Sequence, residues 1–143
     1  MIITKETDYA LRILLVLLDG EKHSVAEMSE TELIPNQFAY QILRKLSTGN
    51  LVRVSRGAFG GCELSCDLNA TSLYDLMEVM GERGVLCACM EPGYNCRWRG
   101  EHGRCAIHCQ LMALQQTQDE AFRAVSLRRL LTGGSDPQDT SEL

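Results

Sequence analysis

Residues 24–61 read SVAEMSETELIPNQFAYQILRKLSTGNLVRVSRGAFGG, and this stretch decides the fold. Ser24 and, three positions later, Glu27 form a capping box, in which each side chain satisfies a free backbone N–H at a helix start. Pro35 lies in the first turn of a second helix, which Gly49 ends. The apolar residues of this second helix are expected on one side: Phe38, Ile42, Leu43 and Leu46. Two short helices joined by a few residues predict a helix-turn-helix.

A β-hairpin is predicted directly after this unit. Residues 51–54 alternate between apolar and polar side chains, as a strand does, and residues 62–64 can pair with them. The segment between them, residues 55–61, contains three glycines, which permit the positive φ angles of a tight turn. A helix-turn-helix followed by such a hairpin is a winged helix, which we expect over residues 1–66.

Three further helices complete the expected fold. A first helix ends at Gly20 and a fourth runs from Ser72 to Gly81. Residues 81–105 show little periodicity, and a loop of that length is usually functional or disordered. The last helix is expected from about residue 106 to 131, and it carries an apolar stripe that a domain this small can hardly cover alone: Ile107, Leu111, Leu114, Ala121 and Val125.

The expected class is therefore mainly α with a small β-hairpin wing, a winged helix-turn-helix plus a long C-terminal dimerisation helix. Residues 1–66 would form the DNA-binding region, and residues 67–105 a connecting helix and a cysteine-rich sensor loop. Residues 106–132 would form the dimerisation helix. Residues 133–143, rich in Gly, Asp, Ser and Thr, would form a disordered tail.

The composition excludes several classes of protein. Of the 143 residues, 45% are apolar and 23% charged, and the net charge of −5 argues against a polybasic binder of any nucleic acid or membrane. Nothing approaches the ~18 consecutive apolar residues of a membrane span, and no signal-peptide pattern is found, so we expect a cytoplasmic protein. The usual catalytic motifs are missing, so we do not expect an enzyme.

Positive charge is nevertheless concentrated in the predicted winged helix. Residues 33–62 contain no acidic residue and four basic ones: Arg44, Lys45, Arg53 and Arg56. Because phosphate contacts act over about a Debye length, ~8 Å in physiological salt, a negative chain can bind DNA through such a patch. Gln37 is placed to meet base edges in the major groove, and Arg56 to enter a minor groove. The alternative is a solvated basic face on an ordinary helix–hairpin unit.

The number and clustering of the cysteines are also unusual. The chain has seven, an odd number that makes a poor disulfide framework, and five lie within 23 residues: Cys87, Cys89, Cys96, Cys105 and Cys109. Thiolates at such spacing, with His108 beside them, suit an iron–sulfur cluster or zinc. Metal-free thiols that pack or form a redox disulfide are the alternative. Cys62 and Cys66 lie apart, and we expect them to be a packing residue and a loop thiol.

Four motifs together resemble a known family. They are Thr7-Asp-Tyr-Ala-Leu-Arg12, Ile42-Leu-Arg-Lys-Leu46, the wing Val54-Ser-Arg-Gly-x-x-Gly-Gly61, and Cys105-x2-His108. The chain resembles the bacterial winged-helix regulators that include the iron–sulfur regulator IscR, the nitric-oxide sensor NsrR and the cysteine-metabolism repressor CymR. The resemblance implies a homodimer whose last helices cross, a palindromic operator in double-stranded DNA, and often a cluster held by three loop cysteines.

The resemblance also implies a ligand set. Cys89, Cys96 and Cys105 best follow the family's three-cysteine loop, although this loop is longer and has surplus cysteines. The fourth ligand would be Asp8 of the partner chain, which we favour, or His108. Cys87 is a possible substitute. Cys109, about 100° further around the helix than His108, is expected to face elsewhere if His108 points at the cluster. The cluster would be 4Fe–4S or 2Fe–2S.

The expected function is that of a dimeric DNA-binding transcription regulator that senses redox state, nitric oxide or iron–sulfur status through this cluster. One alternative of the same fold is a cluster-free thiol switch, and another is a repressor controlled by a partner protein. A small cluster-carrier protein is an alternative of a different class, in which the basic patch would have no use.

Overall fold

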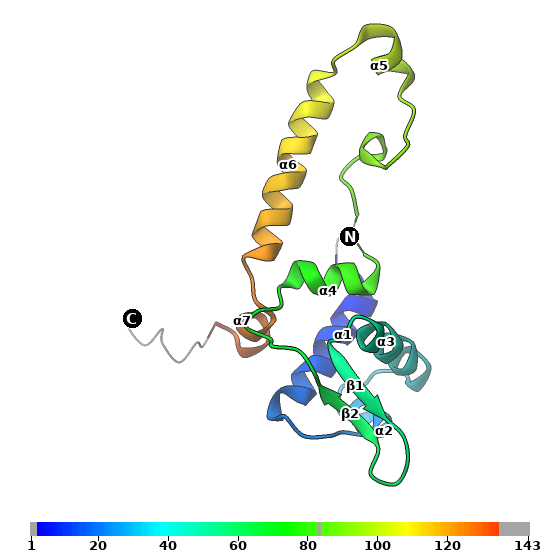
Figure 1. The fold of residues 1–143 in the computed structure, drawn as a ribbon, viewed down its shortest axis with the longest axis vertical. Helices are drawn as coiled ribbons and strands as arrows, with labels where there is room; N and C mark the ends of the chain where they lie inside the picture. Colours follow the sequence, from blue (N-terminus) through cyan, green and yellow to red (C-terminus); the bar gives the residue numbers. More distant parts are fainter. Residues whose placement is uncertain (1–2, 83, 135–143) are drawn as a thin grey trace, which may run out of the picture.

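The computed structural model describes residues 3–82 and 84–134 (Figure 1). Its elements are α1 (Lys5–Val16), η1 (Leu17–Asp19), α2 (Val25–Thr31), α3 (Asn36–Thr48), β1 (Val52–Ser55), β2 (Gly61–Leu64), α4 (Leu73–Met80), η2 (Ala88–Met90), α5 (Arg97–His102), α6 (Ala106–Arg123) and α7 (Leu127–Thr132). Helices dominate and the strands form one two-stranded antiparallel sheet, which confirms the expected class.

The helix-turn-helix forms where its capping signals predict it, but only the Ser24 half of the expected capping box is present, because the Glu27 carboxylate bonds the ring of His23 (3.0 Å). The Ser24 hydroxyl accepts a hydrogen bond from the backbone N–H of Glu27 (3.1 Å) at the start of α2. Leu33 adopts a left-handed conformation in the turn, with φ of 55°, and Pro35 then precedes the first residue of α3. This turn sets α3 across the end of α2, with its polar side toward solvent.

Phe38 departs from the expected pattern. Its side chain is 43% exposed, and its ring tilts against that of Tyr9 on α1 with 6.3 Å between the centroids. The buried residues of α3 are spaced i, i+3, i+4, i+7 and begin one position later: Ala39, Ile42, Leu43 and Leu46. Phe38 therefore lies about 100° away from the centre of the buried face.

The wing forms as predicted. In β1 and β2, Val52 pairs with Leu64 and Ser55 with Gly61. The turn needs glycine, because a Cβ at Gly60 would lie 2.5 Å from the carbonyl oxygen of Ser55. His23 extends the sheet by one rung, since its backbone exchanges two hydrogen bonds with Cys62 (2.9 and 2.8 Å). The wing is thereby tied to the segment that precedes α2.

The C-terminal helix corrects an expectation. In place of one helix over 106–131, α6 ends at Arg123 and α7 starts after Ser126. The main chain of this break pairs with the segment before α4: Leu73 donates to the carbonyl of Val125 (2.9 Å), and Leu127 donates to the carbonyl of Thr71 (2.8 Å). The Ser126 hydroxyl caps α7, and Leu127 becomes fully buried. The chain turns because this pairing and burial outweigh helix continuation.

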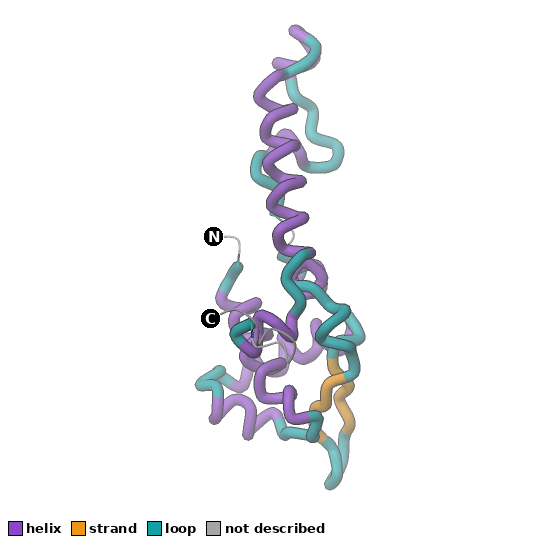
Figure 2. Tube along the Cα trace, turned by 90° about the vertical axis from the view of Figure 1, so that its left-hand side faces the viewer, coloured by secondary structure: helices purple, strands orange, loops and turns teal. Residues whose placement is uncertain are grey.

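Two regions result, which we call the head (residues 3–80 and α7) and the stalk (residues 84–123). The head contains one hydrophobic core, to which α1, α3, α4, the wing and α7 contribute. The stalk carries η2, α5 and α6 and extends away from the head, as Figures 1 and 2 show. The cysteine-rich segment lies beside α6 at the far end. It is thus more structured than the featureless loop that we expected, and the tail from 135 onward is outside the described residues.

Within the described ranges, every helix is too short or too polar to cross a membrane.

Candidate functional site

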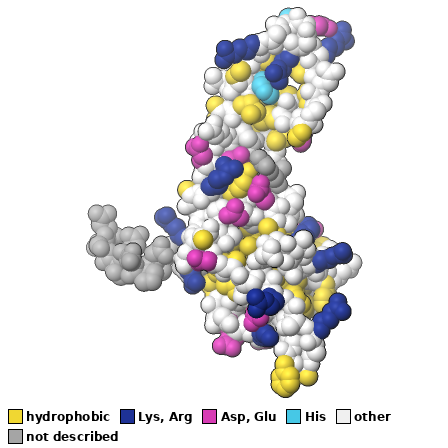
Figure 3. Space-filling model, in the orientation of Figure 1, with side chains coloured by type: hydrophobic (Ala, Val, Ile, Leu, Met, Phe, Trp, Pro, Cys, Tyr) yellow, Lys and Arg dark blue, Asp and Glu magenta, His cyan; other side chains and the backbone are white. Residues whose placement is uncertain are grey.

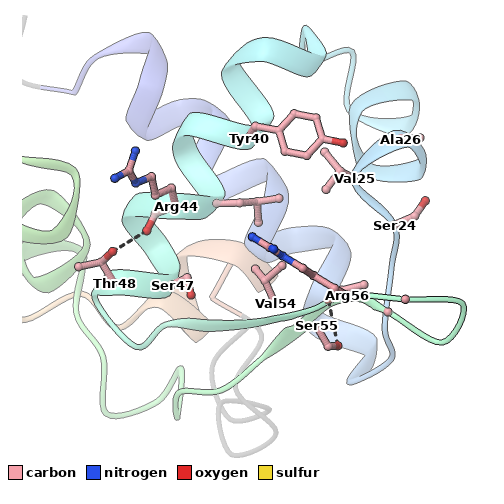
Figure 4. Close-up of a pocket in the computed structure, with 14 residues that line it drawn as sticks. Ser24, Val25, Ala26, Tyr40, Arg44, Ser47, Thr48, Val54, Ser55 and Arg56 are labelled. Atoms are coloured by element: carbon pink, nitrogen blue, oxygen red, sulfur yellow. Dashed lines mark hydrogen bonds between the residues drawn. The ribbon is translucent and has the colours of Figure 1, made fainter.

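A hollow of about 630 Å³ separates α3 from the wing, and we call it the α3–wing groove (Figure 4). Its walls come from the start of α2, the outer side of α3 and the hairpin turn. The lining residues that matter here are Ser24, Tyr40, Arg44, Thr48, Arg56 and Gly60. The groove therefore lies open between α3 and the wing, and a polymer backbone can fit into a groove of this shape.

Two guanidinium groups line this groove. Arg44 projects from α3, and Arg56 extends from the wing toward α3 in Figure 4. Both residues are exposed, and neither makes an ion pair with any other described residue. Their positive charge is therefore available to an anionic partner.

The other predicted DNA contacts are placed differently. Gln37 is exposed in the first turn of α3, where its amide can reach outward. Arg53, 71% exposed, faces Glu63 across the two strands at 3.5 Å. An exposed pair of this kind is weak, so Arg53 can exchange its partner for a phosphate.

Lys45 is half exposed and is bonded to two other elements of the head. Its ammonium lies 2.6 Å from the Glu6 carboxylate and donates to the carbonyl oxygen of Met80 (3.2 Å). These bonds connect α3 with the start of α1 and the end of α4. The contact of Lys45 with DNA phosphate remains a prediction.

Sequence reasoning missed Tyr40. This side chain is 63% exposed and lines the α3–wing groove beside Arg44. Tyr40 falls outside the apolar spacing of α3, and an aromatic residue on the polar side of an amphipathic helix is the signal that could have found it.

The stalk gathers cysteines around His108. The Cys89 Sγ lies 3.2 Å from the His108 Nδ1 and 3.5 Å from the Cys87 Sγ. The Cys105 thiol caps α6 by accepting a hydrogen bond from the backbone N–H of His108 (3.4 Å). One histidine at the start of α6 thus contacts two of the three predicted ligand cysteines.

A second hollow, of about 480 Å³, lies beside this histidine, and we call it the stalk hollow. Cys96 and Cys105, from the two ends of the α5 segment, both line it. Cys109 lines it as well, contrary to the expectation that this residue faces elsewhere. Arg99 and Arg104 add positive charge, and Figure 3 shows basic side chains around a histidine at this end.

The pKa values of the thiols are shifted in different directions. The backbone N–H of Cys89, followed by its thiol, lowers the pKa of Cys87, and the hydrogen bond with Cys87 raises the pKa of Cys89. A hydrogen bond with Cys109 raises the pKa of Arg104. Cys62 is fully buried in the wing, and burial raises its pKa to about 11, in agreement with a packing residue.

Asp8 is far from these thiols along the chain and belongs to the head. It lies in the first turn of α1, where its carboxylate pairs with Arg12 (3.1 Å). Across the described residues, no three His, Cys, Asp or Glu side chains are already arranged around a single metal position. The predicted ligands Cys89, Cys96 and Cys105 are brought to one end of the stalk, and Asp8 is not.

The segment between the head and the stalk is hydrogen-bonded to the start of α1. Glu82, two residues after the end of α4, accepts hydrogen bonds from the hydroxyls of Thr4 and Thr7, and Thr7 is fully buried. Glu6, on the same turn of α1, holds Lys45 of α3. Hydrogen bonds and one ion pair therefore connect the segment after α4, through α1, to the helix that borders the α3–wing groove.

Comparison with known proteins identifies relatives over nearly the whole chain. The family model Rrf2, described as iron-dependent transcriptional regulators, matches residues 3–133. Protein aau3 of Rhizobium meliloti (strain 1021) is 32% identical over 95 residues, which cover 65% of this chain. The match covers 62% of aau3, less than two thirds of its length.

Two solved structures share the fold. CymR (YrzC), the global cysteine regulator of B. subtilis, superposes with a TM-score of 0.66 at 19% identity, over 92% of this chain and 96% of that one. IscR of T. potens superposes with a TM-score of 0.67 at 15% identity, over 98% of this chain and 93% of that one. At these identities the likeness shows a common architecture.

Proposed function

This chain belongs to the Rrf2 family of iron-dependent transcriptional regulators, and we propose that it reads a palindromic operator in double-stranded DNA as a homodimer. Its function is therefore regulation of transcription and not enzymatic catalysis. The observation that carries the DNA proposal is the α3–wing groove, where Arg44 and Arg56 are exposed and unpaired among the described residues.

Each element bordering the groove has a distinct part in the proposal. The first turn of α3 presents Gln37 to base edges of the major groove. Arg56, on the wing, enters the neighbouring minor groove, where A·T-rich sequence concentrates negative potential. Arg44 contacts phosphate, with Arg53 on the outer side of β1 as a further contact. A regulator of this kind acts on DNA in the cytoplasm.

The homodimer is supported by the exposure of α6. None of its residues is buried, and the apolar side chains of Ile107, Met112 and Leu114 are 71%, 45% and 58% exposed. A helix that leaves such side chains in water gains stability when a second copy covers them. Pairing of two α6 helices would hold two heads at a fixed spacing, as two half-sites require.

The thiols of the stalk fit an iron–sulfur cluster. Cys89, Cys96 and Cys105 supply soft thiolate ligands, which iron–sulfur chemistry prefers, and they lie at or beside the stalk hollow. Arg99 and Arg104 at the same hollow would offset the negative charge of a thiolate-bound cluster. When bound, such a cluster would respond to oxidants, nitric oxide or iron supply.

His108 and Asp8 remain the two candidates for the fourth ligand. The contact of His108 with Cys89 favours His108 within one chain, whereas Asp8 would have to come from the partner chain. Asp8→Ala and His108→Ala, each reconstituted without air, separate them. The true ligand is the one whose loss alters the visible spectrum of the cluster and uncouples its state from DNA affinity.

The DNA proposal is tested by selecting duplexes from a palindromic library and measuring affinity by fluorescence anisotropy, with molecular mass from sedimentation. We expect a dimer that binds one class of palindrome. A chain that remains monomeric at micromolar concentration, or that binds every duplex equally, would contradict the proposal. A cluster-carrier function gives no use to the α3–wing groove and predicts that the chain selects no duplex from the library.

A further inference from the structure

The sequence Cys87-Ala88-Cys89 brings two thiols together at the base of the cysteine-rich segment. Their Sγ atoms are 3.5 Å apart, and both residues are half-buried. The one-turn helix η2 begins after Cys87, and the N–H of Met90 donates to the carbonyl of Cys87 (2.9 Å). This turn keeps both side chains on one side of the chain.

Their spacing allows a disulfide. Two residues of chain span at most ~7 Å between Cα atoms when extended, and a bend shortens that distance into the range in which disulfides form. An S–S bond of ~2.05 Å requires the sulfurs to approach by about 1.5 Å, which side-chain rotation can supply. No other two thiols among the described residues are hydrogen-bonded to each other.

His108 gives this pair a proton acceptor. Its Nδ1 is 3.2 Å from the Cys89 Sγ, so an imidazole unprotonated at Nδ1 is placed to take the thiol hydrogen. The Cys89 thiol donates a hydrogen bond to the Cys87 Sγ, which favours a thiolate at Cys87, and the thiolate is the nucleophile in thiol–disulfide exchange. Cys89 then stands within reach as the second thiol.

We propose that Cys87 and Cys89 form a reversible dithiol–disulfide pair that controls whether Cys89 is free to bind iron. The proposal rests on the function proposed above and specifies how the same site is regulated. It also assigns a role to Cys87, which the three-cysteine ligand set leaves unused.

The exchange balances with a small disulfide such as glutathione disulfide as oxidant. The Cys87 thiolate attacks one sulfur, forming a mixed disulfide and releasing one glutathione thiolate, which takes up the proton that Cys87 has lost. The Cys89 thiol then passes its proton to His108 and attacks the Cys87 sulfur, which forms the Cys87–Cys89 bond and releases the second glutathione thiolate, to which His108 returns the proton. Two electrons pass from the protein to the small disulfide, and Cys89 can no longer supply a thiolate.

The test is disulfide mapping on the full chain, reduced and metal-free, after incubation with glutathione disulfide and alkylation of the remaining thiols. Trypsin releases residues 84–97, which contain Cys87, Cys89 and Cys96, so fragment ions between 89 and 96 locate the bond. We expect the Cys87–Cys89 disulfide in wild type and in the control Cys66→Ser, whose thiol lies in the head. Cys89→Ser should instead accumulate glutathione on Cys87.

A second readout uses iron and sulfide added without air. Oxidised wild type should take up far less of both than reduced wild type, and Cys66→Ser should show the same difference. A disulfide that involves Cys96, or equal uptake by the oxidised and reduced chains, would overturn the proposal. The mapping needs no DNA, so failure to bind an operator would count against the proposed function and leave the pair standing.

Discussion

The head and the stalk are stabilised in different ways. The head buries side chains from α1, α3, α4, the wing and α7 in one core, and it is complete within one chain. In the stalk, η2, α5 and α6 contain no buried residue, and apolar side chains of α6 are exposed to water. The head therefore has a core of its own, whereas the stalk leaves apolar side chains that the proposed second copy would cover.

The largest effect is expected in the head's core. Leu46→Ala removes a fully buried side chain of α3 and should lower the free energy of unfolding by ~2–5 kcal/mol. Leu114→Ala, in exposed α6, should change it by less than ~0.5 kcal/mol in dilute, monomeric protein. Denaturant unfolding followed by circular dichroism measures both. Equal losses would erase the distinction between the two regions.

A charge on α6 should affect assembly instead of folding. Leu114→Glu would place a carboxylate in the proposed interface between two stalks, so we expect monomers by sedimentation together with loss of operator binding. The head's thermal unfolding in dilute protein should be unchanged. If this variant is still a dimer, the interface does not include Leu114.

Within the head, the wing and α3 should differ in what they recognise. Arg56→Ala should weaken operator binding by ~1–3 kcal/mol and relax the preference for A·T-rich flanks. Arg44→Ala should weaken all duplexes similarly and flatten the salt dependence by about one unit of log–log slope. Anisotropy titrations at several salt concentrations separate these effects, and unchanged affinity in both variants would exclude the α3–wing groove as the binding surface.

Lys45 offers a smaller test of how the head is connected. Lys45→Ala and Glu6→Gln should each cost ~0.2–1 kcal/mol of stability, because the pair they break is half exposed. The double variant should cost less than the sum of the two. Arg44→Ala, which has no such partner, serves as the control. Additive losses would mean that the ion pair contributes nothing.

The smallest effect concerns His23. Hydrogen bonds to Glu27 and then Asp19 raise its pKa, so the protonated form is favoured in the folded chain. This contribution, ~0.2–1 kcal/mol as for other surface pairs, is fully present below the ordinary histidine pKa of about 6.5. It is lost as the pH rises through the higher folded value. His23→Gln should flatten stability between acidic and neutral pH, and an unaltered profile would refute the assignment.

The parts of the molecule that could be predicted are those with local signals. The cap at Ser24, the position of Pro35 and the wing glycines specify their elements within a few residues, and the charge of Arg44 and Arg56 marks the groove. The break at Ser126 could not be predicted, because it depends on pairing with residues 71–73, more than fifty positions earlier.

The same distinction applies to side chains. The bond of Lys45 with Glu6 joins residues 39 positions apart, and the sequence around Lys45 shows only a basic helix. The position of Cys109 on the stalk hollow depends on how residues 94–105 fold back beside α6. Spacing identifies which cysteines are available, and the three-dimensional structure decides which of them meet.

The most direct test of the account is the iron and sulfide content of the chain purified without air, together with its visible spectrum. The account predicts that wild type contains both elements and absorbs in the visible range. Cys89→Ala, Cys96→Ala and Cys105→Ala should each lose both, while Cys66→Ala, in the head, should retain them. A wild-type chain without iron or sulfide, spectrally identical to Cys96→Ala, would contradict it.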